Sequence, residues 1–144
     1  LPAPTIAFRS KVRASKLTKT LSAVNDQLEP SDSTDRSTPY YDWWPSKDTW
    51  EWVEYDFEKP LSISRSKVFW VEDTPDGGCQ IPAEYEILYL NGNIWEPVST
   101  RTRYKISKNE WNTISFKPIV TQSIKIKVRL KKEYSAGIYE WVIE

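Results

Sequence analysis

Apolar and polar residues alternate along most of the chain beyond residue 50, a pattern that is typical of β-strands with one buried face. The clearest case is "QSIKIKVRLKK" (122–132), in which Ile, Val and Leu residues fall on one side and Lys and Arg residues on the other. Asn91-Gly92 follows another such segment and predicts a β-hairpin turn, with the second strand around Trp95. The remaining segments with this alternation are 52–58, 66–72, 83–90, 112–118 and 137–144.

No segment has a sustained helical period, so the sequence predicts no long helix. The stretch 25–39 is polar and rich in turn residues, and we interpret it as a loop; loops of that length in compact domains are usually functional or disordered. Roughly seven or eight short strands, spaced about ten residues apart, predict an all-β, antiparallel sandwich or barrel. Pro2 and Pro4 indicate that residues 1–11 form a linker or an edge strand, which leaves 12–144 as a single domain.

The charge balance argues against two classes of partner. Lys plus Arg and Asp plus Glu both number 20, and neither nucleic acid nor an anionic membrane surface is favoured without a basic excess. No apolar run approaches the ~18 residues of a membrane span. The first residues show no signal-peptide pattern and the chain begins at Leu1. We therefore expect a piece of a longer protein, without its targeting segment and neighbouring domains.

The residue inventory removes most catalytic chemistry. The chain has no histidine and a single cysteine, Cys79, which excludes the usual nucleophile–histidine pairs, histidine-containing zinc sites and an internal disulfide. Cys79 follows Gly77 and Gly78, which permit a tight turn, and is expected to be a small buried group. Acid pairs such as Asp73 and Asp76 lie on loops without a deep cleft, so we expect no enzyme. Eight tryptophans and eight tyrosines are the unusual part of the composition.

Six segments, taken in order, resemble the discoidin, or coagulation factor 5/8 type C, family, whose fold is a galactose-binding-like jelly-roll β-sandwich. More narrowly, "YYDWWPSKDTWEWVEYDF" (40–57) and "EDTPDGGCQIPAEY" (72–85) are similar to the non-catalytic sandwich of bacterial β-L-arabinofuranosidases of the family 127 type. Gln80 stands where that group is expected to have arginine. The six segments are "VRASKLT" (12–18), "AVNDQ" (23–27), "WVEYDFEKPLSISRSKVFW" (52–70), "AEYEILYLNGNIWEPV" (83–98), "NTISFKPIVTQSIKIKV" (112–128) and "AGIYEWVIE" (136–144).

The resemblance implies a non-catalytic accessory domain of a bacterial glycoside hydrolase, similar to carbohydrate-binding modules of family 32. Its partners would be a plant-type or host glycan and the catalytic domain of the same polypeptide, in the periplasm or outside the cell. The alternative is a structural module that packs against the catalytic domain and binds no sugar itself. Discoidin-like domains also bind phospholipid or protein, and fold membership alone does not decide between these functions. A free-standing enzyme has the least support.

The resemblance also assigns residues 25–50, 73–82, 101–111 and 131–137 to connections, several of which should share the end of the sandwich where ligand loops gather. A sugar needs an exposed aromatic ring for its C–H face and polar groups for its hydroxyls. Adjacent residues in an extended chain point to opposite sides, so we expect one ring of the Trp43-Trp44 pair inside and one partly exposed. An exposed ring is equally compatible with docking onto a catalytic domain. The candidate ligand-binding residues are Tyr40, Tyr41, Trp43, Trp44, Asp73, Gln80, Arg101 and Arg103, with Asp42 and Asp76 as further polar groups.

Four other tryptophans have a structural interpretation. We expect Trp52, Trp70, Trp95 and Trp141 to belong to the framework of the sandwich.

Many relatives hold a structural calcium ion through an acid of the first loop, main-chain carbonyls and a glutamate of the last strand. The resemblance assigns Asn25, Asp26 and Glu140 to this site, although Gln27 replaces the family's glycine. The alternative is that Glu140 pairs with a basic side chain or faces solvent.

Overall fold

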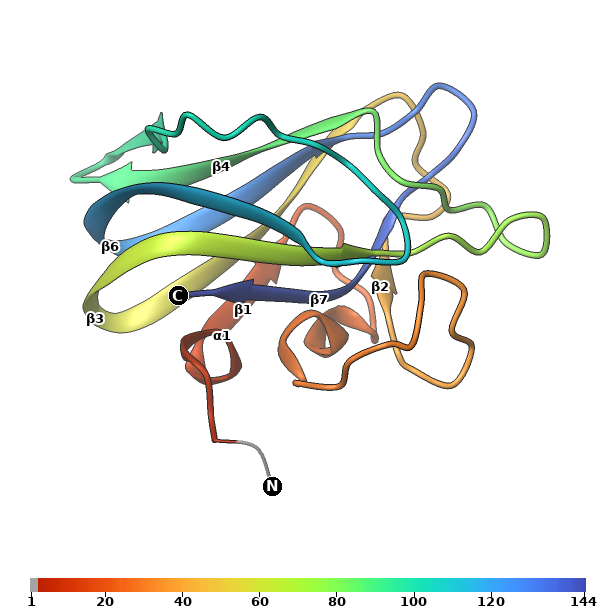
Figure 1. Ribbon diagram of the computed structural model, residues 1–144, viewed down its shortest axis with the longest axis horizontal. Coiled ribbons are helices and arrows are strands. Elements are labelled where there is room, and N and C mark those ends of the chain that lie inside the picture. The colour runs from red at the N-terminus through yellow and green to blue at the C-terminus, as the bar shows by residue number, and fades with distance from the viewer. Residues whose placement is uncertain (1–2) are drawn as a thin grey trace.

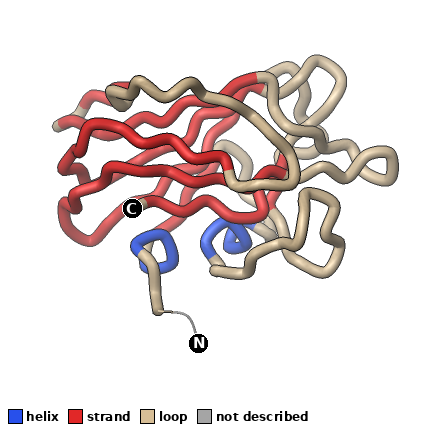
Figure 2. Tube along the Cα trace, viewed as in Figure 1, coloured by secondary structure: helices blue, strands red, loops and turns tan. Residues whose placement is uncertain are grey.

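The computed structural model describes residues 3–144, which form an antiparallel β-sandwich with two short helical segments (Figures 1 and 2). No helix in this part of the chain is long and apolar enough to cross a membrane. The elements are the helix α1 (Ile6–Arg9), the strand β1 (Lys11–Ala14), the 3-10 helix η1 (Leu21–Asn25), and the strands β2 (Tyr41–Asp42), β3 (Trp50–Trp70), β4 (Glu84–Asn91), β5 (Ile94–Pro97), β6 (Asn112–Arg129) and β7 (Gly137–Ile143).

The two long strands, β3 and β6, join the two layers of the sandwich. They pair antiparallel from Trp50–Arg129 to Val68–Asn112, with two register shifts in β3, one between Asp56 and Leu61 and one between Ile63 and Arg65. In Figure 1, β3 turns back on itself at the end of the molecule that is distant from the long loops. The strand order is β2-β7-β3-β6-β4-β5, and β1 also pairs with β3. One layer therefore contains β1, β4 and β5, and the other contains β2 and β7.

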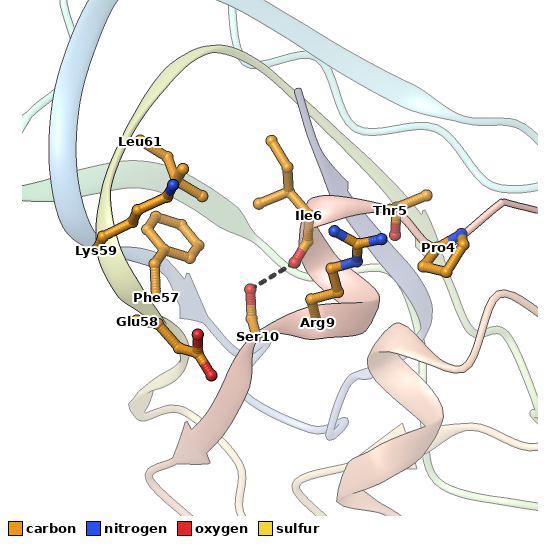
Figure 3. Close-up of a pocket in the computed structure, with 9 residues that line it drawn as sticks. All are labelled: Pro4, Thr5, Ile6, Arg9, Ser10, Phe57, Glu58, Lys59 and Leu61. Carbon is orange, nitrogen blue, oxygen red and sulfur yellow. Dashed lines mark hydrogen bonds between the residues drawn. The ribbon is translucent and has the colours of Figure 1, made fainter.

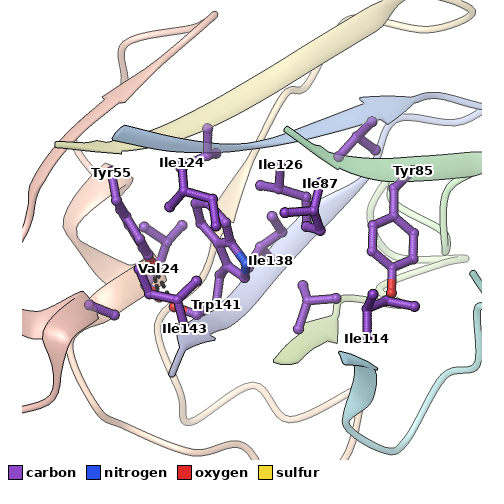
Figure 4. Packing of buried hydrophobic residues seen from close by; sticks show 14 of the residues in the cluster. Val24, Tyr55, Tyr85, Ile87, Ile114, Ile124, Ile126, Ile138, Trp141 and Ile143 are labelled. Carbon is purple, nitrogen blue, oxygen red and sulfur yellow. Dashed lines mark hydrogen bonds between the residues drawn. The ribbon is translucent and has the colours of Figure 1, made fainter. Parts of the chain in front are cut away.

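The core between the layers is built by the alternation seen in the sequence (Figure 4). All four apolar residues of the segment 122–132 are fully buried, as predicted. Tyr55 and Trp141 stack with ring centroids 4.2 Å apart, and the Tyr55 hydroxyl donates to the carbonyls of Val24 and Trp141. These two hydrogen bonds tie η1, β3 and β7 together. The all-β jelly-roll prediction is confirmed.

The segment 1–11 differs from its prediction within its described part. Residues 6–9 form α1 instead of an extended edge, because Thr5 Oγ1 accepts a hydrogen bond from Phe8 N and caps the helix. Ala7 of this turn is fully buried against the sandwich. Lys11, the last residue of this segment, already pairs with Asp56 as the start of β1, and the capping residue Thr5 that starts the helix was not recognised from the sequence.

The layer that contains β1, β4 and β5 carries ordered aromatic and basic side chains on its outer face. Lys125 Nζ lies 4.7 Å from the ring centroid of Trp52 and 4.1 Å from that of Trp95, so it stands between two half-buried indoles. Glu54 lies between the core residues Val53 and Tyr55 and so faces outward, but it is nevertheless buried, because Arg13 of β1 and Lys125 of β6 both pair with it. Trp52 and Trp95 thus stabilise the sheet face, while Trp70 and Trp141 are core residues.

Candidate ligand-binding site

The long loops meet at one end of the sandwich, at the right of Figures 1 and 2. Main-chain hydrogen bonds connect three of them: Trp43 N donates to Ala136 O, Asp48 N to Lys131 O, and Gln80 N to Ser135 O. These three loops are 25–50, 73–82 and 131–137. The first of them is also connected to a fourth loop, 101–111, since Ser33 N donates to Asn109 Oδ1 and Asn109 N donates to Ser33 Oγ. Segments that are up to 93 residues apart in the sequence (43 and 136) therefore form one rigidly connected surface.

These loops also cover the outer face of the sheet at the C-terminal end of β3. Phe69, Val71, Cys79 and Tyr139 form a second, smaller apolar cluster beneath them. Burial raises the pKa of the Cys79 thiol, and neighbouring carboxylates raise it further. Cys79 is therefore a packing residue without nucleophilic character, as predicted.

The two adjacent tryptophans point in opposite directions. Trp43 is fully buried and packs edge-on against Tyr41, with ring centroids 5.3 Å apart. Trp44 leaves 48% of its surface exposed, and its backbone N–H donates to Asp42 Oδ1 at 3.1 Å. The expectation of one inner and one outer ring is thus met, and the outer ring is that of Trp44.

Asp73 organises the loop below Trp44. Its carboxylate is buried and accepts hydrogen bonds from Cys79 N at 2.7 Å and from the Tyr40 hydroxyl at 2.9 Å. The loop from Asp73 to Cys79 passes very close to the side chains of Asp73 and Trp44. A Cβ atom on Gly77 would lie 2.4 Å from the Asp73 carboxylate, and one on Gly78 would lie 2.0 Å from the Trp44 ring. Neither glycine has a positive φ, so they are required for close approach and not for an unusual backbone conformation.

A depression of about 440 Å³ opens beside the exposed indole. Gly77 and Gly78 form part of its wall, and Asp42, Asp73 and Asp76 line it together with Trp44. Burial raises the pKa of Asp42, partly offset by the hydrogen bond from Trp44 N. This arrangement offers a flat apolar face next to several hydrogen-bond acceptors.

The remaining sequence candidates lie elsewhere or are inaccessible. Tyr41 and Trp43 are fully buried, so the interpretation that they contact a ligand is corrected. Gln80 Oε1 accepts from Lys131 Nζ at 3.1 Å, outside the depression. Arg103 and Arg101 are exposed and line two other shallow depressions, which share no residue with the one beside Trp44. The structure therefore brings together Tyr40, Asp73 and Trp44 but not the two arginines.

One participant was not recognised from the sequence. Arg36 donates to Asp76 Oδ2 at 3.1 Å and to the carbonyl of Asp73 at 3.3 Å, and so fastens the long loop to the wall of the depression. Arg36 lies in a polar segment without periodicity, and no local pattern distinguishes it from its neighbours.

The predicted calcium ligands lie where the end of η1 meets β7, with Glu140 in the middle of that strand and Asn25 and Asp26 at the end of η1. Glu140 is buried at 2% exposure; its Oε2 accepts from Gln27 N at 3.2 Å, while its Oε1 has no hydrogen-bond partner. Burial and the adjacent Asp26 raise the pKa of Glu140 to about 10. Among residues 3–144, no lysine or arginine forms a salt bridge with Glu140, so neither alternative of a basic partner or solvent exposure holds.

These residues fit a cation. A buried carboxylate with an unpartnered oxygen beside a second carboxylate is a site where a divalent ion would offset the cost of burial. Among the described residues, no three acidic, cysteine or histidine side chains are placed so that they could hold a metal ion together, so main-chain carbonyls would have to supply most ligands. Asn25 contributes differently, because its Nδ2 donates to Ala7 O at 2.7 Å and fixes α1 against η1. Gln27 has a φ of 64°, which explains why the family's glycine belongs at this position.

A second depression, of about 500 Å³, lies between α1 and the bend of β3 (Figure 3). Its apolar lining residues are flanked by charged Arg9, Glu58 and Lys59; the apolar ones are Pro4, Ile6, Phe57 and Leu61. Phe57 is only 7% exposed, so this depression offers no free aromatic face. It is also distant from the loop end of the sandwich (Figure 1). We therefore take the depression beside Trp44 as the candidate site.

A two-layered jelly roll that presents its long loops at one end defines the chain as a galactose-binding-like module. The model of the F5/8 type C domain matches residues 14–141, and the chain belongs to this family. Domains of this family are non-catalytic binding modules, in agreement with the prediction that the chain by itself is not an enzyme.

Solved structures with the same fold include parts of carbohydrate-active proteins. The β-galactosidase BgaA of Streptococcus pneumoniae matches with a TM-score of 0.78 and 20% identity over 93% of this chain and 90% of that chain. Chitosan-binding module 1 of a chitosanase/glucanase from Paenibacillus sp. IK-5 has a TM-score of 0.69 and 15% identity, covering 97% and 98%. The family 32 module of Clostridium perfringens NanJ, solved in complex with galactose, has a TM-score of 0.66 and 18% identity, covering 96% of each chain.

Proposed function

We propose that this chain is a carbohydrate-binding module of a larger, extracytoplasmic bacterial glycoside hydrolase, and that it holds glycan against the exposed face of Trp44. The observation that carries the proposal is the half-exposed indole at the rim of a depression lined by hydrogen-bond acceptors. The similarity to modules of glycan-active proteins supports it. The arginines 101 and 103 and Gln80 have no part in this site.

The geometry suggests how a sugar would be held. The indole stacks against the C–H face of one sugar ring, while the carboxylates of Asp42 and Asp76 accept hydrogen bonds from its hydroxyls. Gly78 packs under Trp44, so the ring is supported before the ligand arrives and loses little freedom on binding. Lys47 Nζ lies 5.4 Å from the Trp44 ring centroid on an exposed side chain, which can move aside. A single stacked ring predicts dissociation constants of about 1 mM.

A titration with a matched variant tests the proposal. The domain is titrated to millimolar concentrations with galactose-, arabinose- and uronate-containing oligosaccharides while tryptophan fluorescence is followed. Trp44→Ala should abolish a saturating response, whereas Trp50→Ala should preserve it. Trp50 is a suitable control because it is 43% exposed but lies outside the depression, under Lys127. A response that survives Trp44→Ala, or none with any glycan, contradicts the proposal.

The alternative function is a structural module that docks onto a catalytic domain. The exposed rings of Trp44 and Trp50 are the observation in its favour, since both would be covered in such an interface. In that case glycans leave the fluorescence unchanged, and the full-length protein protects Trp44 from an aqueous quencher better than the isolated domain does.

We also propose that Asp26 and Glu140 hold a structural calcium ion together with main-chain carbonyls of the first loop. Such an ion would neutralise two adjacent carboxylates and fasten η1 to β7. The unpartnered Oε1 atom of Glu140 supports this assignment. A melting temperature that is the same with calcium and with a chelator would contradict it.

A further inference from the structure

The outer face of the layer that contains β7 carries an excess of positive charge. Thr113, Ser115 and Lys117 of β6 are exposed and alternate with buried core residues, so they lie on this outer face. Lys67 and Arg65 of β3 pair with Thr113 and Ser115 and therefore lie on the same face. Both long strands thus present basic side chains here.

The segment between β5 and β6 adds further cations to this face. It runs along the sandwich to the loop end and then returns into β6 (Figure 1). Residues 99–117 contain five Lys and Arg residues and one acid. Lys117 N donates to Ser99 O, and Thr100 Oγ1 donates to Ser115 O. These hydrogen bonds hold the segment against β6 and fix the backbone that carries its basic side chains.

Two depressions adjoin along this segment, since both are lined by Thr102. The first, of about 510 Å³, contains Trp111 in its wall, and the second has a volume of about 450 Å³. We call the two together the basic groove. Glu110, in the first depression, is the one acid among its lining residues. The basic lining residues are Arg101, Arg103, Lys105 and Lys117.

The cations of the basic groove lack carboxylate partners. Among residues 3–144, none of its four basic lining residues forms a salt bridge. Lys67 Nζ lies 5.4 Å from the ring centroid of Trp111 and brings a further cation to the first depression. It is 3.9 Å from Glu144 Oε1, but that oxygen also accepts from Arg65 Nε at 2.8 Å. The groove therefore has positive charge that an anionic ligand would neutralise.

Trp111 gives the first depression a fixed apolar wall. Its half-buried ring packs edge-on against Phe69, with ring centroids 5.5 Å apart. The turn that precedes it is held by the buried side chain of Asn112, which donates to the carbonyls of Ser107 and Glu110 and accepts from Ser107 N at 2.7 Å. A fixed indole beside several cations is suited to a sugar ring that carries a negative group.

We propose that the basic groove is a second glycan-binding site, selective for acidic polysaccharides, which carry carboxylate or sulfate groups along the chain. One sugar ring packs on Trp111 while acidic groups of this and neighbouring sugars pair with Arg103 and Lys105. Single surface ion pairs are weak, so selectivity requires several of them together. Nucleic acid is disfavoured because the chain as a whole has no net charge. The groove shares no residue with the depression beside Trp44, so this inference goes beyond the proposed function.

Three hexamers with one backbone test the inference. β-1,4-linked chains of glucose, glucuronic acid and glucose 6-sulfate differ only at the sixth carbon. At low ionic strength we expect at least one acidic hexamer to bind about tenfold more tightly than the neutral one, and about fivefold of this preference to disappear as sodium chloride is raised. The stronger of the two acidic hexamers identifies the acidic group. In a nitrogen–proton spectrum its binding should shift the indole resonance of Trp111 and leave that of Trp44 in place.

Paired charge removals locate the site. Arg103→Gln combined with Lys105→Gln removes two charges from the basic groove and should weaken binding of the acidic hexamer about tenfold. Lys11→Gln combined with Lys19→Gln is the matched control, since it removes two positive charges from exposed residues outside the groove. It should change the affinity by less than about twofold. All four residues are exposed, so both variants are expected to fold.

The outcomes separate this inference from the proposed function. Equal affinity for the neutral and acidic hexamers overturns the inference, as does no binding of either acidic hexamer or an equal loss in the two double variants. Tighter binding of a single-stranded oligonucleotide of equal charge, with a shift of Trp111, also overturns it. A response to uronate that survives Trp44→Ala but disappears in the Arg103 and Lys105 double variant belongs to the basic groove. Neutral glycans then decide the function of the site beside Trp44.

Discussion

Replacing Glu140 by glutamine should stabilise the calcium-free protein at neutral pH. Glu140 is buried beside Asp26 with one oxygen unpartnered, and these surroundings raise its pKa from the usual 4.5 to about 10. In the unfolded chain the carboxyl is ionised at pH 7, whereas in the calcium-free folded chain it is protonated. Folding therefore takes up one proton. Glutamine resembles the protonated acid and needs no proton.

The magnitude follows from proton linkage. A group whose pKa is raised on folding stabilises the native state fully below its unfolded pKa, and this contribution is lost as the pH rises toward its folded pKa. Between the unfolded value of 4.5 and pH 7 the loss is about 3 kcal/mol, at about 1.4 kcal/mol per pH unit. Glu140→Gln avoids this loss, so at pH 7 and without calcium the variant should be more stable by about 1–3 kcal/mol.

Urea denaturation in the presence of a chelator measures the effect at pH 5, 6, 7 and 8. The difference between the variant and the parent should grow by up to about 1.4 kcal/mol per pH unit, which separates Glu140 from all groups that titrate in both proteins. With calcium in excess the order should reverse, because only the parent gains from the ion. A variant that is less stable than the parent by the same amount at every pH, with or without calcium, refutes the reasoning about Glu140.

Two glycine positions give further predictions. Gly78→Ala places a Cβ atom 2.0 Å from the Trp44 ring and should push the indole into solvent. We expect weaker glycan binding in the fluorescence titration and a loss of less than about 1 kcal/mol in urea denaturation. Retained glycan binding contradicts the close packing. Gln27→Gly relieves a φ of 64° and should be neutral or stabilising by up to about 1 kcal/mol in thermal unfolding, unlike most substitutions of a half-buried residue. A loss of stability above about 1 kcal/mol would show that the hydrogen bond from the Gln27 side chain to Ala3 O outweighs the backbone strain.

The fold was predictable because its main signal is local. The alternation at Ile124, Ile126 and Val128 survives in the structure, since a strand of a two-layered sandwich must bury one face. The opposite orientations of Trp43 and Trp44 follow from the same two-residue period. Apart from the short helix α1, whose local cap at Thr5 was not recognised, the sequence interpretation failed at contacts between distant segments, which no local period encodes.

The site illustrates this limit. Tyr41 is buried because its hydroxyl reaches Lys16 O, 25 residues away, at 2.6 Å. Arg103 lies outside the depression because the loop that carries it is held through Asn109 to Ser33, a connection between two stretches of polar residues. Gly78 was interpreted through its backbone freedom, whereas its role is to admit the Trp44 ring. Composition pointed to an aromatic site, and only the tertiary structure identified which ring is available.

The indole N–H resonance of Trp44 offers the most direct measurement of the central claim, that the loop end of this sandwich holds glycan on one exposed ring. In a two-dimensional nitrogen–proton spectrum, adding an oligosaccharide that binds should shift this resonance progressively until the site is saturated, while the resonance of Trp50 stays in place. Movement of Trp50 with an unchanged Trp44, or a spectrum that does not respond to any sugar, would show that the glycan contact lies elsewhere or does not exist.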